Sequence, residues 1–295
     1  MKVTEKFLPD QTSLSFEFFP PKTLEQEQNL FTVIGQLKDF KPDFASVTYG
    51  AMGATREKTF YWAKELKQDF GIEPVAHLTC VAATKEDIRQ QLDELASYGV
   101  ENILALRGDP PEGQKEFVPP PAGFHYAKEL ITFIRNYNPS FSLGVAGFPE
   151  GHPLAPSLLD DTRYLKEKIE AGAEYIISQL FFDNAYFLQF LERCQKAGIN
   201  VPIIAGIMPI TSLKQIKKMT EICGATVPPK LLAELEKNEH NRKAIEEIGA
   251  EQAVKQCQEL LKAKVAGLHF FVMNQAGPIS TILRQLKFGR DSAIH

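Results

Sequence analysis

A carboxylate within an apolar stretch is the first feature of this sequence that could do chemistry. Glu17 lies in Leu14-Ser-Phe-Glu-Phe-Phe-Pro-Pro21, a Phe-rich run that favours a buried strand ending near Pro20. Burial penalises the charged form of a carboxyl group and raises its pKa, so Glu17 is expected to be paired, hydrogen-bonded or protonated. A protonated Glu17 could do acid–base chemistry. A solvent-facing Glu17 at a strand edge, or one paired with a buried arginine, is equally compatible with this stretch alone.

Other apolar segments also end on polar residues. Each such residue has a structural explanation: a hydrogen-bonded histidine, a local ion pair or a satisfied amide. Together they predict an active-site mouth, provided that the strand ends meet at one rim. The residues are Thr48-Tyr49-Gly50, His77, Arg107-Gly108-Asp109, Glu150-Gly151-His152, Gln179 and Asn274-Gln275.

The elements that must position these residues alternate regularly along the chain. Apolar, strand-like runs follow the first strand at 44–50, 73–80, 102–108, 142–149, 175–182, 202–209 and 267–274. Helical spacing is found at 24–40, 56–70, 84–99, 126–137, 157–171, 185–197, 212–222 and 279–286, with a more polar helical excursion over 228–264. The pattern predicts an α/β fold, a single (β/α)8 TIM barrel domain over residues 1–295 with extra helices before the last strand. A doubly wound open sheet is the competitor, because periodicity does not reveal strand order.

Composition and missing motifs narrow the chemistry. The 33 basic and 37 acidic side chains give a net charge of -4, which argues against a nucleic-acid binder. No signal peptide or membrane-length apolar run is found, so a cytoplasmic protein outside the membrane is expected. The sequence has no dinucleotide fingerprint, phosphate-binding loop or nucleophile elbow, which leaves acid–base chemistry or a cofactor held by the mouth. Four cysteines lie far apart without zinc-site spacing, so no metal site is predicted: Cys80, Cys194, Cys223 and Cys257.

Six ordered motifs resemble a known family across nearly the whole chain. They are Phe16-Glu-Phe-Phe-Pro-Pro21, Val47-Thr-Tyr-Gly-Ala51, His77-Leu-Thr-Cys80, Ala105-Leu-Arg-Gly-Asp109, Phe148-Pro-Glu-Gly-His-Pro153 and Gln179-Leu-Phe-Phe-Asp183. This set is similar to methylenetetrahydrofolate reductases of the short bacterial type. The resemblance implies a flavin-containing (β/α)8 barrel that reduces 5,10-methylenetetrahydrofolate to 5-methyltetrahydrofolate with NADH or NADPH. It implies ping-pong hydride transfer, a place in one-carbon metabolism and methionine synthesis, and a homo-oligomer, either a dimer or a tetramer.

The resemblance also assigns roles to individual residues. Glu17 would be the general acid that protonates the folate N10, and Asp109 would lie near the flavin and the folate. The implied FAD contacts are Thr48, Tyr49, Ala51, His77, Arg107, Gly108, Asp109, Tyr126, Ala127, His152, Asp161 and Lys168. The implied folate contacts are Gln179, Gln215 and Gln275. Three positions depart from the family pattern: Phe148 in place of a tyrosine, Met219 in place of an aromatic residue and Gln275 in place of an arginine.

Two other functions stay open at this point. A flavin-free lyase or aldolase could use Glu17 and His77 as acid and base, since barrels host many chemistries. A flavoprotein subunit could instead be reduced by a partner protein. The sequence does not distinguish NADH from NADPH, and at this length we expect no regulatory domain of the kind found in eukaryotic relatives.

Overall fold

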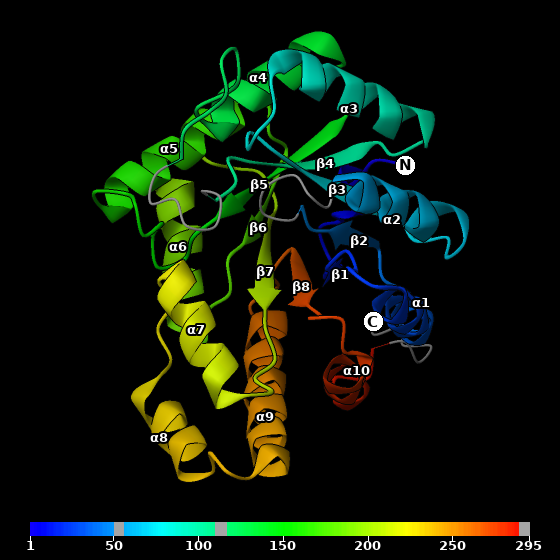
Figure 1. Ribbon diagram of the computed structural model, residues 1–295. Coiled ribbons are helices and arrows are strands. Elements are labelled where there is room, and N and C mark those ends of the chain that lie inside the picture. The colour runs from blue at the N-terminus through cyan, green and yellow to red at the C-terminus, as the bar shows by residue number, and fades with distance from the viewer. Residues whose placement is uncertain (50–55, 110–116, 289–295) are drawn as a thin grey trace.

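Eight parallel strands close into a barrel in the described part of the chain (Figure 1). The computed structural model describes residues 1–49, 56–109 and 117–288. The strands pair in sequence order, and β8 pairs with β1, with Ser13 opposite Gly267 and Glu17 opposite Phe271. The (β/α)8 prediction is confirmed, and the open doubly wound sheet is wrong. The strands are β1 (Ser13–Phe18), β2 (Phe44–Val47), β3 (Pro74–Thr79), β4 (Asn102–Leu106), β5 (Ser142–Gly147), β6 (Tyr175–Ser178), β7 (Ile203–Ile207) and β8 (Gly267–Phe271).

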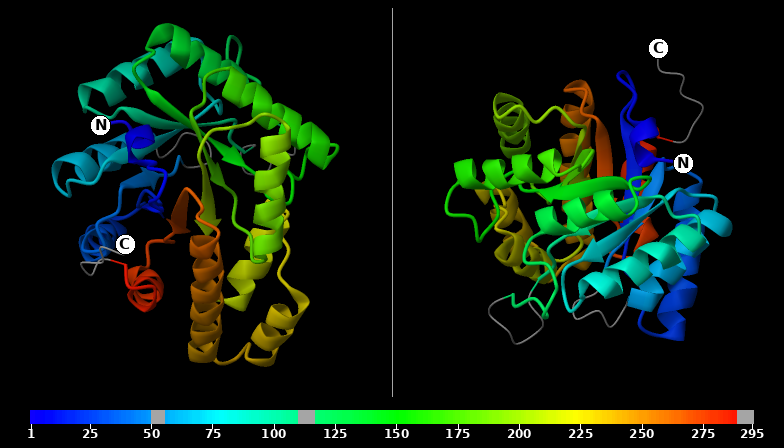
Figure 2. Two further views of the ribbon diagram at one scale, coloured as in Figure 1. Left: turned by 180° about the vertical axis from the view of Figure 1, so that it is seen from behind. Right: turned by 90° about the horizontal axis from the view of Figure 1, so that it is seen from above.

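Helices surround the barrel on its outer face (Figure 2). The extra helical segment before β8 consists of two helices, α8 and α9, and α9 begins where the Asn241 side chain accepts a hydrogen bond from the Ala244 N–H. The helices are α1 (Leu24–Lys38), α2 (Arg56–Gln68), α3 (Lys85–Ser97), α4 (Ala127–Tyr137), α5 (Leu158–Glu170), α6 (Asn184–Lys196), α7 (Leu213–Cys223), α8 (Pro229–Lys237), α9 (Arg242–Lys262) and α10 (Ala276–Gln285). No helix in the described ranges is both long and apolar enough to span a membrane.

The N-terminal segment fills the amino end of the barrel. After the 3-10 helix η1 (Val3–Lys6), the Phe7 ring contacts Phe44 and Tyr175, the first residues of β2 and β6, with centroid distances of 6.3 and 5.7 Å. The Val3 N–H donates to Asn102 Oδ1 at the start of β4 (2.7 Å). Because side chains fill this end, the carboxyl end is where a site can open, as in other barrels of this class.

Strands β6 and β7 lie very close together at Gly206, beside the mouth of the barrel. This close approach predicts how a substitution at Gly206 changes the free energy of unfolding. Gly206→Ala is expected to lower the free energy of unfolding by about 1–3 kcal/mol, because an added methyl overpacks the barrel wall. Its Cβ would lie 2.2 Å from the Ser178 carbonyl oxygen and 2.8 Å from the Phe271 ring. Gly35→Ala in α1 is the control: nothing lies within 4 Å of its Cβ. Replacing this helical glycine should stabilise by roughly 0.5–1 kcal/mol.

Urea-induced unfolding measures both variants. Equal stability of Gly206→Ala and the parent protein would contradict the close approach of β6 and β7.

Candidate active site

Glu17 lies inside the barrel wall between two histidines from other strands. Its Oε2 is 3.3 Å from His77 Nε2 on β3 and 3.5 Å from His269 Nε2 on β8. The Ser46 hydroxyl on β2 donates to the same oxygen (3.3 Å), and Ser15 Oγ is 2.8 Å from His269 Nδ1. All five side chains are buried. The carboxylate is therefore paired, but with imidazoles rather than with an arginine.

The histidines reverse the pKa shift that burial alone would cause. Burial raises the pKa of Glu17, while the neighbouring His269 and His77 imidazoles lower it, and together they hold it at about 2. The expectation of a raised pKa is therefore wrong for this structure. The Glu17 carboxyl is ionised at neutral pH, and any proton it delivers must first reach it from a neighbour.

A second cluster of charged residues gathers between β4, β5 and α5. Lys168 is half-buried, and its Nζ donates to the Ala146 carbonyl oxygen (2.9 Å). Burial lowers the Lys168 pKa to about 8, although Asp161 opposes this. Burial, Arg107 and Lys168 lower the pKa of His152, while Asp109 raises it. These predicted cofactor contacts therefore lie within electrostatic range of one another.

Asp161 belongs to the same cluster. Burial raises its pKa, while Lys168, a backbone hydrogen bond from His152 and Arg193 lower it. Asp161 and Lys168 therefore interact by charge across the cluster.

The turn after β4 requires a glycine. Gly108 has φ of 84°, a region that side chains disfavour, and an added Cβ would lie 2.4 Å from Val81 Cγ2. The neighbouring Arg107 Nε donates to the Gly108 carbonyl oxygen (3.3 Å), and its guanidinium lies 5.6 Å from the Phe117 ring centroid. This turn leaves Asp109 exposed at the mouth.

The other predicted cofactor contacts occupy the carboxyl end of the barrel at different depths. Thr48 is half-buried, and its N–H donates to the Phe18 carbonyl oxygen (3.0 Å), while Tyr49 packs against the core. Tyr126 and Ala127 lie at the start of α4, where Tyr126 is 64% exposed and so available to a ligand. Ala51 lies outside the described residues.

Of the predicted folate contacts, Gln179 directly follows β6, Gln215 lies in α7 and Gln275 directly precedes α10. The Gln179 Oε1 accepts from the Leu180 N–H (2.8 Å), so only its amide nitrogen is unpartnered within the described ranges. Gln215 Oε1 accepts from the Thr211 hydroxyl (3.3 Å). Gln275 is exposed at the start of α10. Of the two other departures, Phe148 contacts the His152 ring at 4.6 Å, and Met219 packs on the apolar cluster under α7.

Comparison with known proteins decides the family. A model of the methylenetetrahydrofolate reductase family matches residues 2–287. The chain belongs to the methylenetetrahydrofolate reductase family. It is 37% identical to the 5,10-methylenetetrahydrofolate reductase of Escherichia coli over 268 residues, which cover 90% of this chain and 88% of that one. It is 38% identical to methylenetetrahydrofolate reductase (NADH) 1 of Arabidopsis thaliana, covering 93% of this chain and 49% of the relative.

This methylenetetrahydrofolate reductase family member therefore spans about half the length of the plant relatives it matches. Among solved structures, an uncharacterised Clostridium thermocellum protein described as binding two copies of 5-methyl-5,6,7,8-tetrahydrofolic acid aligns with a TM-score of 0.68. The alignment covers 96% of both chains at 18% identity, so it supports the barrel fold alone.

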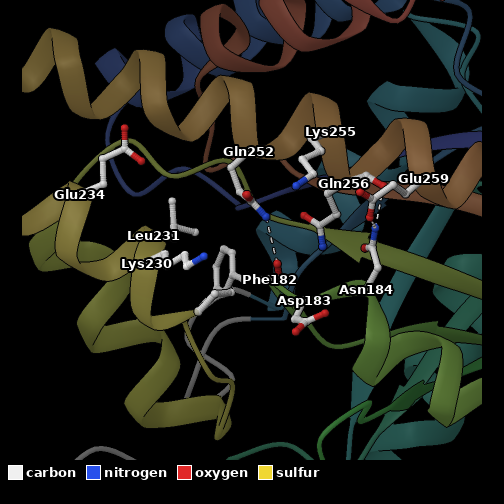
Figure 3. Close-up of a pocket in the computed structure, with 11 residues that line it drawn as sticks. Phe182, Asp183, Asn184, Lys230, Leu231, Glu234, Gln252, Lys255, Gln256 and Glu259 are labelled. Carbon is white, nitrogen blue, oxygen red and sulfur yellow. Dashed lines mark hydrogen bonds between the residues drawn. The ribbon is translucent and has the colours of Figure 1, made fainter.

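A separate cavity of about 370 Å³ lies between the β6–α6 loop, α8 and α9 (Figure 3). None of the predicted catalytic, cofactor or folate residues lines it. The lining residues are Phe182, Asp183, Asn184, Pro228, Lys230, Leu231, Glu234, Gln252, Lys255, Gln256 and Glu259. Within 1–49, 56–109 and 117–288, no group of three or more His, Cys, Asp or Glu side chains could hold a metal ion.

His269 is a titratable residue of the candidate site that the sequence analysis missed. It lies in the apolar strand β8, and its ring stacks on Phe44 at 6.0 Å. A titratable side chain within an apolar run is the same signal that singled out Glu17, so His269 could have been identified in the same way. Ser15 and Ser46 carry no such signal, because small hydroxyl residues are common in strands.

Proposed function

We propose that this protein reduces 5,10-methylenetetrahydrofolate to 5-methyltetrahydrofolate with NADH or NADPH. The observation that carries the proposal is the buried Glu17 carboxylate, flanked by His77 and His269 near the carboxyl end of the barrel. Family membership supplies the substrate class. A reduction of this kind needs a proton at the folate nitrogen as its ring opens, and this cluster is suited to hold one.

Glu17 is the group that transfers the proton in this proposal. Its carboxyl is ionised in the free protein, so folate binding must be accompanied by protonation of Oε2 from an imidazole 3.3 or 3.5 Å away. An imidazole nitrogen can both hold and release a proton, which suits this relay. Ser15 holds His269 through Nδ1, which leaves Nε2 directed at Glu17.

The charged cluster fits the phosphates of FAD. Lys168 has three N–H donors and bonds only one described acceptor, the Ala146 carbonyl oxygen, so two donors are available to an anion. Arg107 and His152 add nitrogen donors in electrostatic range. When bound, FAD would accept hydride from the nicotinamide and pass it to the folate methylene carbon, which makes the reaction ping-pong. The proposed contacts are Thr48, Tyr49, Ala51, His77, Arg107, Gly108, Asp109, Tyr126, Ala127, His152, Asp161 and Lys168.

Polar residues at the rim would orient the folate. The free amide nitrogen of Gln179 can donate to a pterin or carbonyl acceptor, and Gln215 and Gln275 offer further amide groups. The exposed Asp109 carboxylate would stabilise the cationic form of the folate by charge. Cytoplasmic location, homo-oligomerisation, a single-domain chain and a role in methionine supply remain predictions from the sequence.

The visible absorption spectrum of the purified protein tests the proposal. Flavin bands are expected to bleach when NADH is added without oxygen and to return when methylenetetrahydrofolate follows. Bands that bleach only with NADPH would identify NADPH as the co-substrate. Bands that neither nicotinamide bleaches would favour a subunit reduced by a partner protein. A protein that stays colourless after incubation with FAD would contradict the reductase and favour the lyase.

A further inference from the structure

We propose that Glu150 is a positioning residue that couples the cofactor side of the site to the folate side. This inference rests on the proposed function. Both carboxylate oxygens of Glu150, in the loop between β5 and α5, accept the Thr226 backbone N–H, at 3.0 and 3.1 Å. Thr226 lies in the segment that joins α7 to α8. The bond thus joins two loops that are 76 residues apart in the sequence.

The two loops also pack against each other beside this bond. Gly224, which ends α7, has φ of 71°, and an added Cβ would lie 3.1 Å from Pro153 Cγ. Burial raises the pKa of the Cys223 thiol, and the Glu150 charge adds to this, so Glu150 lies near the last residue of α7 as well. Glu150 therefore holds the C-terminal end of α7 against the β5–α5 loop.

The partners on the two sides have different proposed tasks. The β5–α5 loop carries His152, a proposed cofactor contact, while α7 carries Gln215, a proposed folate contact. The β5–α5 loop is also held from α6, because Arg193 Nη2 donates to the Pro149 carbonyl oxygen (3.1 Å). Loss of the Glu150 bond should therefore release α7 more than it releases the cofactor loop.

The expected result for Glu150→Ala is a selective loss of folate affinity. The KM for methylenetetrahydrofolate should rise about 3- to 10-fold, the range for one net hydrogen bond at a half-exposed position. The maximal rate and the FAD content should stay within roughly twofold of the parent protein, because no reacting group has been touched. Glu150→Gln keeps one acceptor oxygen and should restore most of the affinity.

A variant on the same helix provides the matched control. Lys217 of α7 pairs with Glu236 of α8 (2.7 Å), and Glu236→Ala removes this exposed pair without touching the cofactor loop. Exposed pairs contribute little, so its KM should stay near that of the parent. Amide hydrogen exchange at Thr226 is measured on the same proteins and should accelerate in Glu150→Ala alone.

The outcomes separate the two proposals. A parent protein that binds FAD but never reduces the folate would overturn the proposed function, and the Thr226 exchange would still report whether Glu150 holds α7. A parent-like KM in Glu150→Ala, or an equal KM increase in Glu236→Ala, would overturn the positioning role. An equal loss in Glu150→Gln and Glu150→Ala would overturn it too.

Discussion

Glu17→Gln is expected to abolish most folate reduction while leaving nicotinamide oxidation intact. A positioned general acid typically contributes about 10²- to 10⁴-fold, so the rate of the folate half-reaction should fall by that factor. The amide is nearly isosteric and can still accept from the Ser46 hydroxyl, so the fold should persist. Hydride transfer from NADH requires no proton from Glu17 and should proceed within roughly threefold of the parent rate. Stopped-flow absorbance of the two half-reactions measures each rate separately.

Glu25→Gln provides the control for this experiment. Glu25 lies exposed in the first turn of α1, so its replacement should leave both half-reactions unchanged. If Glu17→Gln still reduced the folate at the parent rate, the proton would have another source. If it lost both half-reactions together, Glu17 would be a structural residue of the barrel wall.

Because the two histidines lower the pKa of Glu17, the stability of the protein should also depend on pH. The folded-state pKa of Glu17 is about 2, below the ordinary value of 4.5, so the ionised carboxylate stabilises the fold above about pH 4.5. That contribution decreases as the pH falls from 4.5 toward 2, because protonation then opposes folding. Glu17→Gln cannot ionise, so its unfolding free energy should depend less steeply on pH in this range. Urea titrations at several pH values measure the difference.

The barrel could be predicted from sequence because its elements are locally determined. Parallel strands buried on both faces are continuous apolar runs, and Thr84 with Asp87 forms the capping box that begins α3. The predicted ends of individual strands and helices were less accurate. The second strand ends at Val47 rather than residue 50, because the polar residues that follow leave the sheet for the mouth. The last helix begins at Ala276, since Pro278 is tolerated in a first helical turn.

The electrostatics of the site could not be predicted, because they depend on contacts between distant segments. Apolar neighbours in sequence predicted a raised pKa for Glu17, but the imidazoles that lower it come from β3 and β8. Ser15 and His269, which form one hydrogen-bonded unit, are 254 residues apart. Only the closing of β8 onto β1 places them side by side, and strand order is invisible to periodicity. The identity of a candidate acid was therefore readable from sequence, while its protonation state required the fold.

Lys168→Met is expected to weaken FAD binding more than any other single change in the charged cluster. The variant keeps most of the length of the side chain but removes the ammonium, and one charge-assisted hydrogen bond is worth about 1.5–3 kcal/mol, or roughly 10- to 150-fold in Kd. Lys168→Arg keeps the charge and should bind more tightly than the methionine variant. Lys166→Met, at a half-exposed position on the same helix paired with Glu170 at 3.8 Å, is the matched control and should bind like the parent. Quenching of FAD fluorescence measures all four proteins.

The pH dependence of FAD binding separates a charge effect from a packing effect. Lys168 has a pKa of about 8, so it is charged below that pH and becomes neutral above it. An anionic cofactor prefers the charged form, so the parent protein should bind FAD less tightly as the pH rises above 8, by at most about tenfold per pH unit. Lys168→Met should lack this decrease, because it has no proton to lose there. A parallel decrease in both proteins would show that Lys168 does not contact the phosphates, whereas a Kd of Lys168→Met equal to that of the parent would remove it from the cofactor site altogether.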